Sequence, residues 1–255
     1  MYYGIEISII FVLGLIIGSF NNVCIYRIPK NESIIFPASH CTKCHSTIKA
    51  VDNIPVLSYF LLRGKCRKCG EKISIRYPIV ELITGLIYVS LFFIYGRSTL
   101  ALIYAILSSA LIIISFIDLD EQIIPDEISL PGIAIGFIIS FFVSYISYID
   151  SLLGILVGGG IILLIALAGM AVFKKEAMGG GDVKLAAMIG AFIGWRYIAL
   201  SLFIGFFIGA IVGIVLIVLK VKNKDDLVPF GPFIVLGSFI TILWGKNILT
   251  WYLGF

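Results

Sequence analysis

Four of the five cysteines in this 255-residue chain form two pairs, and two residues stand between the members of each pair. The pairs read CTKC and CRKC, 21 residues separate them, and their members are Cys41, Cys44, Cys66 and Cys69. This pattern suits tetrahedral coordination of one metal ion by four thiolates, and zinc is the usual metal in such sites. We therefore predict a structural zinc site. Two disulfides are the alternative, which a reducing compartment disfavours.

Three other metal-binding side chains need an explanation. His40 and His45 flank the first cysteine pair and could serve as alternative ligands. Because four thiolates are already present, we expect both histidines to be solvated neighbours of the site. The fifth cysteine, Cys24, lies in an apolar segment, where we expect an inert small hydrophobic side chain.

Two aspartates stand at the ends of apolar segments. Asp118 begins the polar part of IDLDEQIIPDE (117–127), and Asp182 follows three glycines in GGGDVK (179–184). A carboxylate at a membrane face costs free energy and therefore suggests a function. Two facing carboxylates share a proton, and such a pair can activate water for attack on an amide. From the residues alone, an Asp118/Asp182 pair is one hypothesis among several.

The other acidic residues have ordinary explanations. Asp120 and Glu121 could be solvated charges at the membrane interface. Asp126 follows a proline and precedes an apolar segment, so we expect it to cap a helix. Glu81 lies inside an apolar segment, where pairing with Arg76 or a lysine would explain it.

The three glycines before Asp182 are expected to support it. Gly179, Gly180 and Gly181 have no side chains, so a peptide could approach the aspartate closely and the backbone could turn sharply. Asp182 could also cap the following helix, and that role is compatible with catalysis.

The elements that carry these residues must lie in a membrane. The chain is 60% hydrophobic and 13% charged, with a mean hydropathy of +1.10. A soluble domain of this size could not bury so much apolar surface. We predict an all-α polytopic membrane protein of about eight transmembrane helices with a small zinc-binding cytoplasmic loop domain. The predicted spans are 5–26, 78–95, 99–117, 127–147, 151–173, 183–196, 198–220 and 229–250. Because 183–196 is short and runs into the next span, seven spans are the alternative.

The basic residues predict the orientation of these spans. Ten of the nineteen lysines and arginines lie between Arg27 and Arg76. They lack the interleaved aromatic residues of a nucleic-acid surface, so we expect no nucleic-acid partner. If this loop is cytoplasmic, sixteen basic residues face that side, including Lys174, Lys175, Lys184, Lys220, Lys222 and Lys224; only Arg97, Arg196 and Lys246 face the other. The first apolar segment has no basic region before it and no cleavage site, which predicts a retained span.

Three parts of the chain follow from this topology. Residues 1–26 are the first transmembrane helix, and 27–77 form a cytoplasmic four-cysteine zinc loop domain. This loop is too short for a large core and needs a metal to fold. Residues 78–255 carry both aspartates and form the remaining membrane domain.

The motifs together resemble one family, the prepilin peptidases or type IV leader peptidases, which are membrane aspartic proteases of the GxGD kind. Besides the two cysteine pairs, the matching stretches are GSFNNVCIYRIP (18–29), DNIPVLSYFLLRGKCRKC (52–69), ISIRYPIVELITG (73–85), IDLDEQIIPDEISLP (117–131) and GGGDVKLAAMIGAFIGW (179–195). One departure is the residue after Cys41, where relatives often have proline and this chain has threonine; it does not affect ligation.

The resemblance implies an activity and a location. Family members cut the short basic leader from pilin-like precursors at the cytoplasmic face of the bacterial inner membrane, and their catalytic aspartates fall on Asp118 and Asp182. This choice favours Asp118 over Asp120. Bifunctional members then methylate the new N-terminal amine with S-adenosylmethionine. The four-cysteine loop goes with that branch, in which Gly64 and Lys65 fall on positions associated with methyl transfer.

Two alternatives stay open at this stage. The chain could be a peptidase only, with the zinc loop as a module that docks the substrate. It could also be a non-catalytic membrane scaffold or transporter, in which Asp118 and Asp182 serve an ion pathway.

Overall fold

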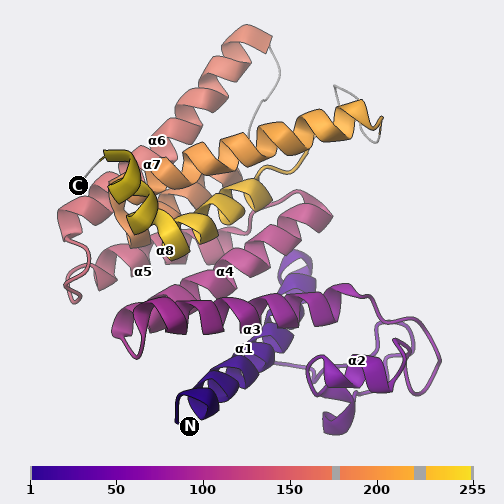
Figure 1. The fold of residues 1–255 in the computed structure, drawn as a ribbon. Coiled ribbons are helices and arrows are strands. Elements are labelled where there is room, and N and C mark those ends of the chain that lie inside the picture. The colour runs from indigo at the N-terminus through magenta and orange to yellow at the C-terminus, as the bar shows by residue number, and fades with distance from the viewer. Residues whose placement is uncertain (1, 174–178, 221–227, 254–255) are drawn as a thin grey trace. The chain divides into compact units, whose positions relative to one another are not determined.

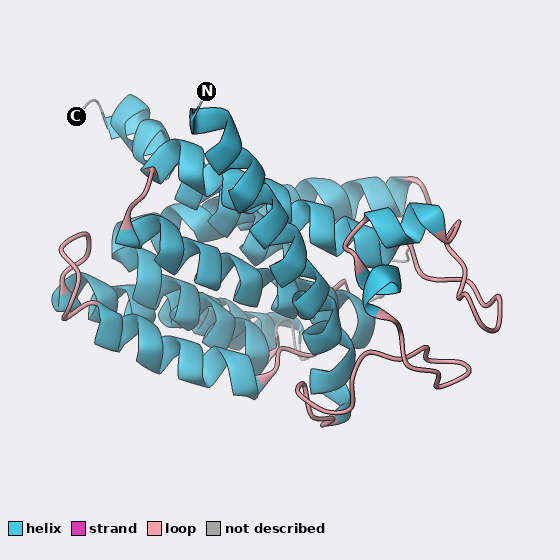
Figure 2. Cartoon of the chain, turned by 90° about the horizontal axis from the view of Figure 1, so that it is seen from below, coloured by secondary structure: helices cyan, strands magenta, loops and turns pink. Residues whose placement is uncertain are grey.

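The computed structural model describes residues 2–173, 179–220 and 228–253. These residues form helices and loops, and Figure 2 shows no strand among them, as the sequence predicts. The chain divides into two compact units, Met1–Ile113 and Ile114–Phe255. Each unit contains one of the two groups of residues that could do chemistry.

The first unit is built on two long helices, α1 (Tyr2–Arg27) and α3 (Arg76–Tyr95), which pack along each other. Small residues permit this close packing. A Cβ atom on Gly14 would lie 2.7 Å from the Cα atom of Gly85, and one on Gly18 would lie 2.6 Å from that of Glu81. The backbones therefore approach to a distance that larger side chains would prevent.

A long loop joins these two helices and holds only short helical segments. These are the 3₁₀ turns η1 (Ile28–Lys30) and η2 (Ala50–Asn53), and the five-residue helix α2 (Leu57–Leu61). Arg27 fixes the start of the loop, because its guanidinium donates to the carbonyl oxygens of Ser33 and Pro37 at 2.8 and 2.7 Å. The cysteine pairs lie in this loop.

The second unit begins within α4 (Thr99–Glu121) and contains α5 (Asp126–Ile139), α6 (Tyr148–Phe173), α7 (Gly180–Val218) and α8 (Gly231–Leu253). Figure 1 shows α6 and α7 running beside each other. Their backbones meet at Gly154 and Gly190, where a Cβ atom on either glycine would overlap the other's carbonyl group. The helix α7 forms the centre of the unit, because α5, α6 and α8 all pack against it.

The predicted span count needs correction. Among the described residues, six helices are long and apolar enough to cross a membrane. One of them, α7, is two helices merged across a kink at Gly194, whose φ of 78° and ψ of 170° are not helical. This kink lies at the predicted break between 183–196 and 198–220. Each of the eight predicted segments therefore contains a helix, but fewer than eight are long enough to span.

The helix α5 is the clearest departure from prediction. It has 14 residues and ends at Ile139, whereas the sequence suggested a span to residue 147. At a rise of about 1.5 Å per residue it is roughly 21 Å long, short of a bilayer core of about 30 Å. The next helix begins early because the hydroxyl of Ser147 accepts a hydrogen bond from the backbone N–H of Asp150 at 3.0 Å and donates one to its carboxylate at 2.8 Å. Such a reciprocal cap starts a helix.

Four of the basic residues used to predict orientation lie outside the described residues: Lys174, Lys175, Lys222 and Lys224. The orientation of the chain in the membrane therefore rests on the sequence pattern.

Candidate active site and metal centre

Asp118 lies in the last turn of α4, with 5% of its surface exposed. Its Oδ2 oxygen accepts a hydrogen bond from the backbone N–H of Gly231 at 3.0 Å. Gly231 is the first residue of α8, so this carboxylate satisfies one of the N–H groups that a helix leaves free at its N-terminus. A Cβ atom at Gly231 would lie only 2.6 Å from the same oxygen, so only glycine leaves room for the contact.

Asp182 lies at the start of another helix, α7. It lies in the first turn of α7 with 8% of its surface exposed, and its backbone N–H donates to the carbonyl oxygen of Gly179 at 3.1 Å. Gly179 is the N-cap residue, so the expectation that Asp182 caps the helix is wrong. A carboxylate in the first turn is nevertheless favoured by the partial positive charge of the helix N-terminus.

The two carboxyl groups come together in the second unit although 64 residues separate them in the sequence. They are close enough for the charge of Asp118 to act on Asp182. Asp120, two residues beyond Asp118, is instead exposed. The structure thus places one buried carboxyl group against the N-terminus of α8 and another in the first turn of α7. Two such groups can share one proton between them.

The three glycines before Asp182 have different surroundings. A Cβ atom on Gly181 would lie 2.9 Å from the Cβ atom of Ile124, so this glycine lets the segment before α5 pack closely. Gly180 has open space around it, and a Cβ atom on Gly179 would lie 3.8 Å from the carboxylate of Asp182. The backbone beside the carboxylate is therefore uncovered by side chains at two of the three positions.

Asp126 does not cap a helix, contrary to the sequence prediction. The N-cap of α5 is Pro125, and no side chain bonds to the helix end there. The carboxylate of Asp126 instead pairs with Lys184, whose Nζ atom lies 2.6 and 2.8 Å from its two oxygens. This ion pair joins the first turn of α5 to the N-terminal part of α7, and so it holds the segment that carries Asp182.

The four sulfur atoms of Cys41, Cys44, Cys66 and Cys69 lie within 4.8 Å of one another, and all are free thiols. The Cys41 and Cys69 sulfurs are 3.8 Å apart, close to the edge of a tetrahedron with bonds of about 2.3 Å to a central zinc. This donor set and spacing fit a metal ion. The geometry does not support the alternative of two disulfides.

Neither histidine belongs to the sulfur cluster. The Nδ1 atom of His40 lies 3.1 Å from the carbonyl oxygen of Ala38, and the His40 and His45 rings are 6.0 Å apart. Cys24 is buried in α1 with 3% of its surface exposed, as expected for an inert apolar side chain.

The two cysteine pairs are copies of one ten-residue motif, SHCTKCHSTI (39–48) and GKCRKCGEKI (64–73). In each copy, the backbone N–H of the first cysteine donates to the carbonyl oxygen of the residue five positions later. The carbonyl oxygen of the same cysteine accepts the backbone N–H of the residue four positions later, which has a positive φ. The backbone N–H of the tenth residue donates to the carbonyl oxygen of the first, and an isolated antiparallel β-bridge joins the second residue to the ninth. This repeat was not predicted from the sequence, although it is visible there once the two cysteine pairs are aligned.

Gly64 lies at the start of the second copy, with a φ of +65°. A Cβ atom there would lie 3.1 Å from the hydroxyl oxygen and 3.2 Å from the ring carbon Cζ of Tyr59. Glycine at position 64 therefore leaves the room that the Tyr59 ring occupies. Lys65 is exposed, and its backbone forms the bridge to Lys72.

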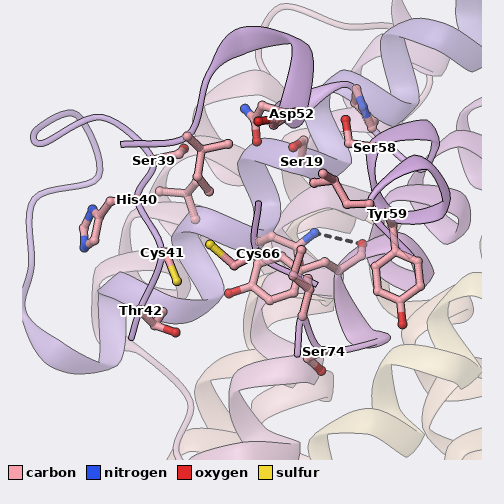
Figure 3. Close-up of a pocket in the computed structure, with 18 of the residues that line it drawn as sticks. Ser19, Ser39, His40, Cys41, Thr42, Asp52, Ser58, Tyr59, Cys66 and Ser74 are labelled. Atoms are coloured by element: carbon pink, nitrogen blue, oxygen red, sulfur yellow. Dashed lines mark hydrogen bonds between the residues drawn. The ribbon is translucent and has the colours of Figure 1, made fainter. Parts of the chain in front are cut away.

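A cavity of about 700 Å³ lies in the first unit. It is lined by both cysteine motifs, α2, the end of α1 and the start of α3; Figure 3 shows Cys41 and Cys66 on its wall with Tyr59 and Ser58 from α2. Neither Gly64 nor Lys65 is among the lining residues, so Gly64 acts on the cavity only through Tyr59.

Glu81 lies at this cavity and has 7% of its surface exposed. The expected ion pair with Arg76 or a lysine does not form. Its Oε2 oxygen instead accepts the backbone N–H of Val56 at 2.7 Å, and the hydroxyl of Ser19 also bonds to its side chain. Val56 has a φ of 64°, which leaves its N–H pointing to this carboxylate.

The other carboxylate at the cavity, Asp52, is paired. The guanidinium of Arg67 contacts both of its oxygens at 2.6 to 3.0 Å. Hydrogen bonds from Arg67 lower the pKa of Asp52 below its ordinary value. This pair ties the second cysteine motif to η2.

The chain matches two family models. Residues 12–95 match the bacterial peptidase A24 N-terminal domain, and residues 105–214 match the type IV leader peptidase family. No solved structure matches it.

Several curated proteins are similar over nearly the whole chain, and all are named prepilin leader peptidase/N-methyltransferase. The protein from Pseudomonas putida is 36% identical over 95% of this chain and 92% of its own length. Those from Aeromonas salmonicida and Pseudomonas aeruginosa are each 34% identical, over 96% and 95% of this chain and 93% and 92% of their own lengths.

Proposed function

Because the chain belongs to the type IV leader peptidase family, we propose that it cleaves the short basic leader from pilin-like precursors and then methylates the new N-terminal amine. The observation that supports cleavage most directly is the pair of buried carboxylates, Asp118 and Asp182, at two helix N-termini of one compact unit.

The two carboxyl groups have complementary roles in peptide hydrolysis. The charged member takes a proton from water as the water oxygen attacks the scissile carbonyl carbon. The protonated member donates to the carbonyl oxygen. When the tetrahedral intermediate collapses, the C–N bond breaks and the leaving amine takes a proton from the pair. The Gly231 N–H stabilises a charge on Asp118, and the N-terminus of α7 stabilises one on Asp182, so the shared proton belongs to the pair.

The location of the two aspartates at helix ends supports a membrane-embedded precursor as the substrate. Both aspartates lie at helix ends, where a precursor embedded in the bilayer can meet water. The acidic residues Glu121 and Glu127 are exposed nearby in the sequence and suit a positively charged leader. We place this face in the cytoplasm and the chain in the bacterial inner membrane, because the basic residues of the loop favour that orientation.

Methyl transfer is assigned to the loop domain, residues 27–77, and cleavage to residues 78–255. The four thiolates would hold a zinc ion with a structural role, since a closed four-sulfur site leaves no position open for substrate. S-Adenosylmethionine, when bound, supplies an electrophilic methyl group that the new amine takes from the sulfonium, while the nitrogen loses a proton.

The proposal is tested by incubating the purified chain in detergent or liposomes with a pilin precursor, with and without S-adenosylmethionine. We expect a product without its leader in both reactions, heavier by one CH₂ group only when S-adenosylmethionine is present. A cleaved product with no added mass would reduce the function to peptidase alone, with the loop as a docking module. No cleavage by a folded protein would favour a scaffold or transporter.

A further inference from the structure

The cavity in the first unit has the size and lining of a small-molecule site. Its volume of about 700 Å³ lies within the range of about 300–1,000 Å³ that is usual for ligand pockets. Most of its wall is apolar, with aromatic side chains such as Tyr59 and Tyr77, and a few polar groups converge on it.

Among the charged residues that line the cavity, only Arg27 and Glu81 are buried, whereas Lys49, Lys68, Glu71 and Lys72 are exposed. The carboxylate of Asp52 is neutralised by Arg67, and the guanidinium of Arg27 is used by the carbonyls of Ser33 and Pro37. Glu81 forms no ion pair with any described residue, and its contacts are the uncharged N–H of Val56 and hydroxyl of Ser19. A buried carboxylate without a counter-ion is costly, and a cationic ligand would remove that cost.

Asn22 adds a second acceptor to the same cavity. It has 2% of its surface exposed, and its Nδ2 atom donates to the carbonyl oxygens of Tyr77 and Gly18 at 3.0 and 3.3 Å. Its Oδ1 atom is buried and has no hydrogen-bond partner among the described residues. A buried acceptor without a donor is uncommon and indicates a ligand that brings one.

We propose that this cavity binds the methyl donor, S-adenosylmethionine, and that Glu81 and the Oδ1 atom of Asn22 face its cationic methionyl part. The donor carries an ammonium, whose N–H groups can both pair with the uncompensated carboxylate and donate to the free acceptor, and a sulfonium, whose positive charge the same carboxylate favours. Its nucleoside suits the aromatic and aliphatic wall. This inference rests on the proposed methyl transfer. It also explains why the cysteine motifs accompany that activity, since Cys41 and Cys66 form part of the cavity wall.

Binding should be measured directly on the purified full-length protein, without precursor, by equilibrium dialysis of radiolabelled S-adenosylmethionine. We expect the variant Glu81→Gln to weaken binding by about tenfold or more, as loss of a charged hydrogen bond would. The matched control is Glu32→Gln, the same chemical change at an exposed residue outside the cavity, which should bind as the parent does. Circular dichroism and gel filtration check that each variant is folded.

A second measurement locates the site independently of affinity. Ultraviolet crosslinking of the labelled donor, followed by peptide mass spectrometry, should mark peptides from 16–27 or 39–81. Crosslinks confined to 114–255, or unchanged affinity in folded Glu81→Gln, would overturn the assignment of the cavity even if the protein methylates its product. Absence of both binding and methylation would instead overturn the proposed methyl transfer itself.

Discussion

The backbone N–H of Gly231 donates to the Oδ2 oxygen of Asp118 across 3.0 Å, and it joins the first residue of α8 to the last turn of α4. These residues are 113 positions apart in the sequence. The contact both satisfies a helix end and orients a carboxylate that we assign to catalysis.

This contact makes Gly231 a positioning residue. In Gly231→Ala, the new methyl group would stand 2.6 Å from the Asp118 oxygen and push the carboxylate aside. We expect cleavage of a pilin precursor to slow by about 100-fold, as a shift of about 1 Å in a catalytic group can cause. The control is Gly213→Ala, which adds the same methyl group to α7 with no atom within 4 Å. Equal turnover by the two variants would contradict this role.

The aspartates themselves give a sharper contrast. Asp118→Asn and Asp182→Asn each remove one of the two carboxyl groups that share the proton. Each variant should lower the cleavage rate by at least about 100-fold, since general acid–base catalysis contributes that much or more. Asp120→Asn makes the same change at an exposed residue two positions from Asp118 and should retain most of the rate. Rates are followed by gel shift of the precursor. Near-parental cleavage by either of the first two variants would exclude the proposed pair.

Loss of the metal should affect the two activities unequally. In Cys41→Ser or Cys66→Ser, one thiolate of the four-sulfur cluster is lost, and the loop should lose the fold that coordination stabilises. We expect about one zinc per parent chain by elemental analysis, much less in the variants, and a larger fall in methylation than in cleavage. Equal loss of both activities would argue against a separate role for the loop.

Gly64 offers a test that separates backbone strain from displacement of a neighbour. Gly64→Ala places a methyl group 3.1 Å from the Tyr59 hydroxyl, at a φ of +65°. Gly70→Ala meets similar strain, with a φ of +73°, but has open space around it. If Gly64 acts by leaving room for Tyr59 at the cavity, only Gly64→Ala should raise the KM for S-adenosylmethionine beyond the effect of strain, by about tenfold. Similar KM values in both variants would reduce the role of Gly64 to backbone conformation.

The local sequence predicts much of the helical structure and the metal cluster. The helix positions follow from runs of apolar residues, and the metal cluster follows from two CxxC pairs, because their ligand spacing is set within four residues. The kink at Gly194 also falls where the predicted spans are interrupted. The prediction missed the end of α5 because the residues before Ser147 are apolar on average, so the predicted span extended through them. The cap at Ser147 instead begins the next helix.

What only the tertiary structure decided are the relationships between distant residues. Residue types place Asp126 at a helix start and Glu81 inside a span, but a carboxylate pairs with whatever group the fold brings near it. For Asp126 that group is Lys184, and for Glu81 it is the backbone of Val56. The same holds for Gly231 and Asp118. A hydrogen bond between two helix ends depends on how the helices pack, and no periodic sequence pattern predicts it. The sequence by itself determined which residues could do chemistry, and packing decided which of them meet.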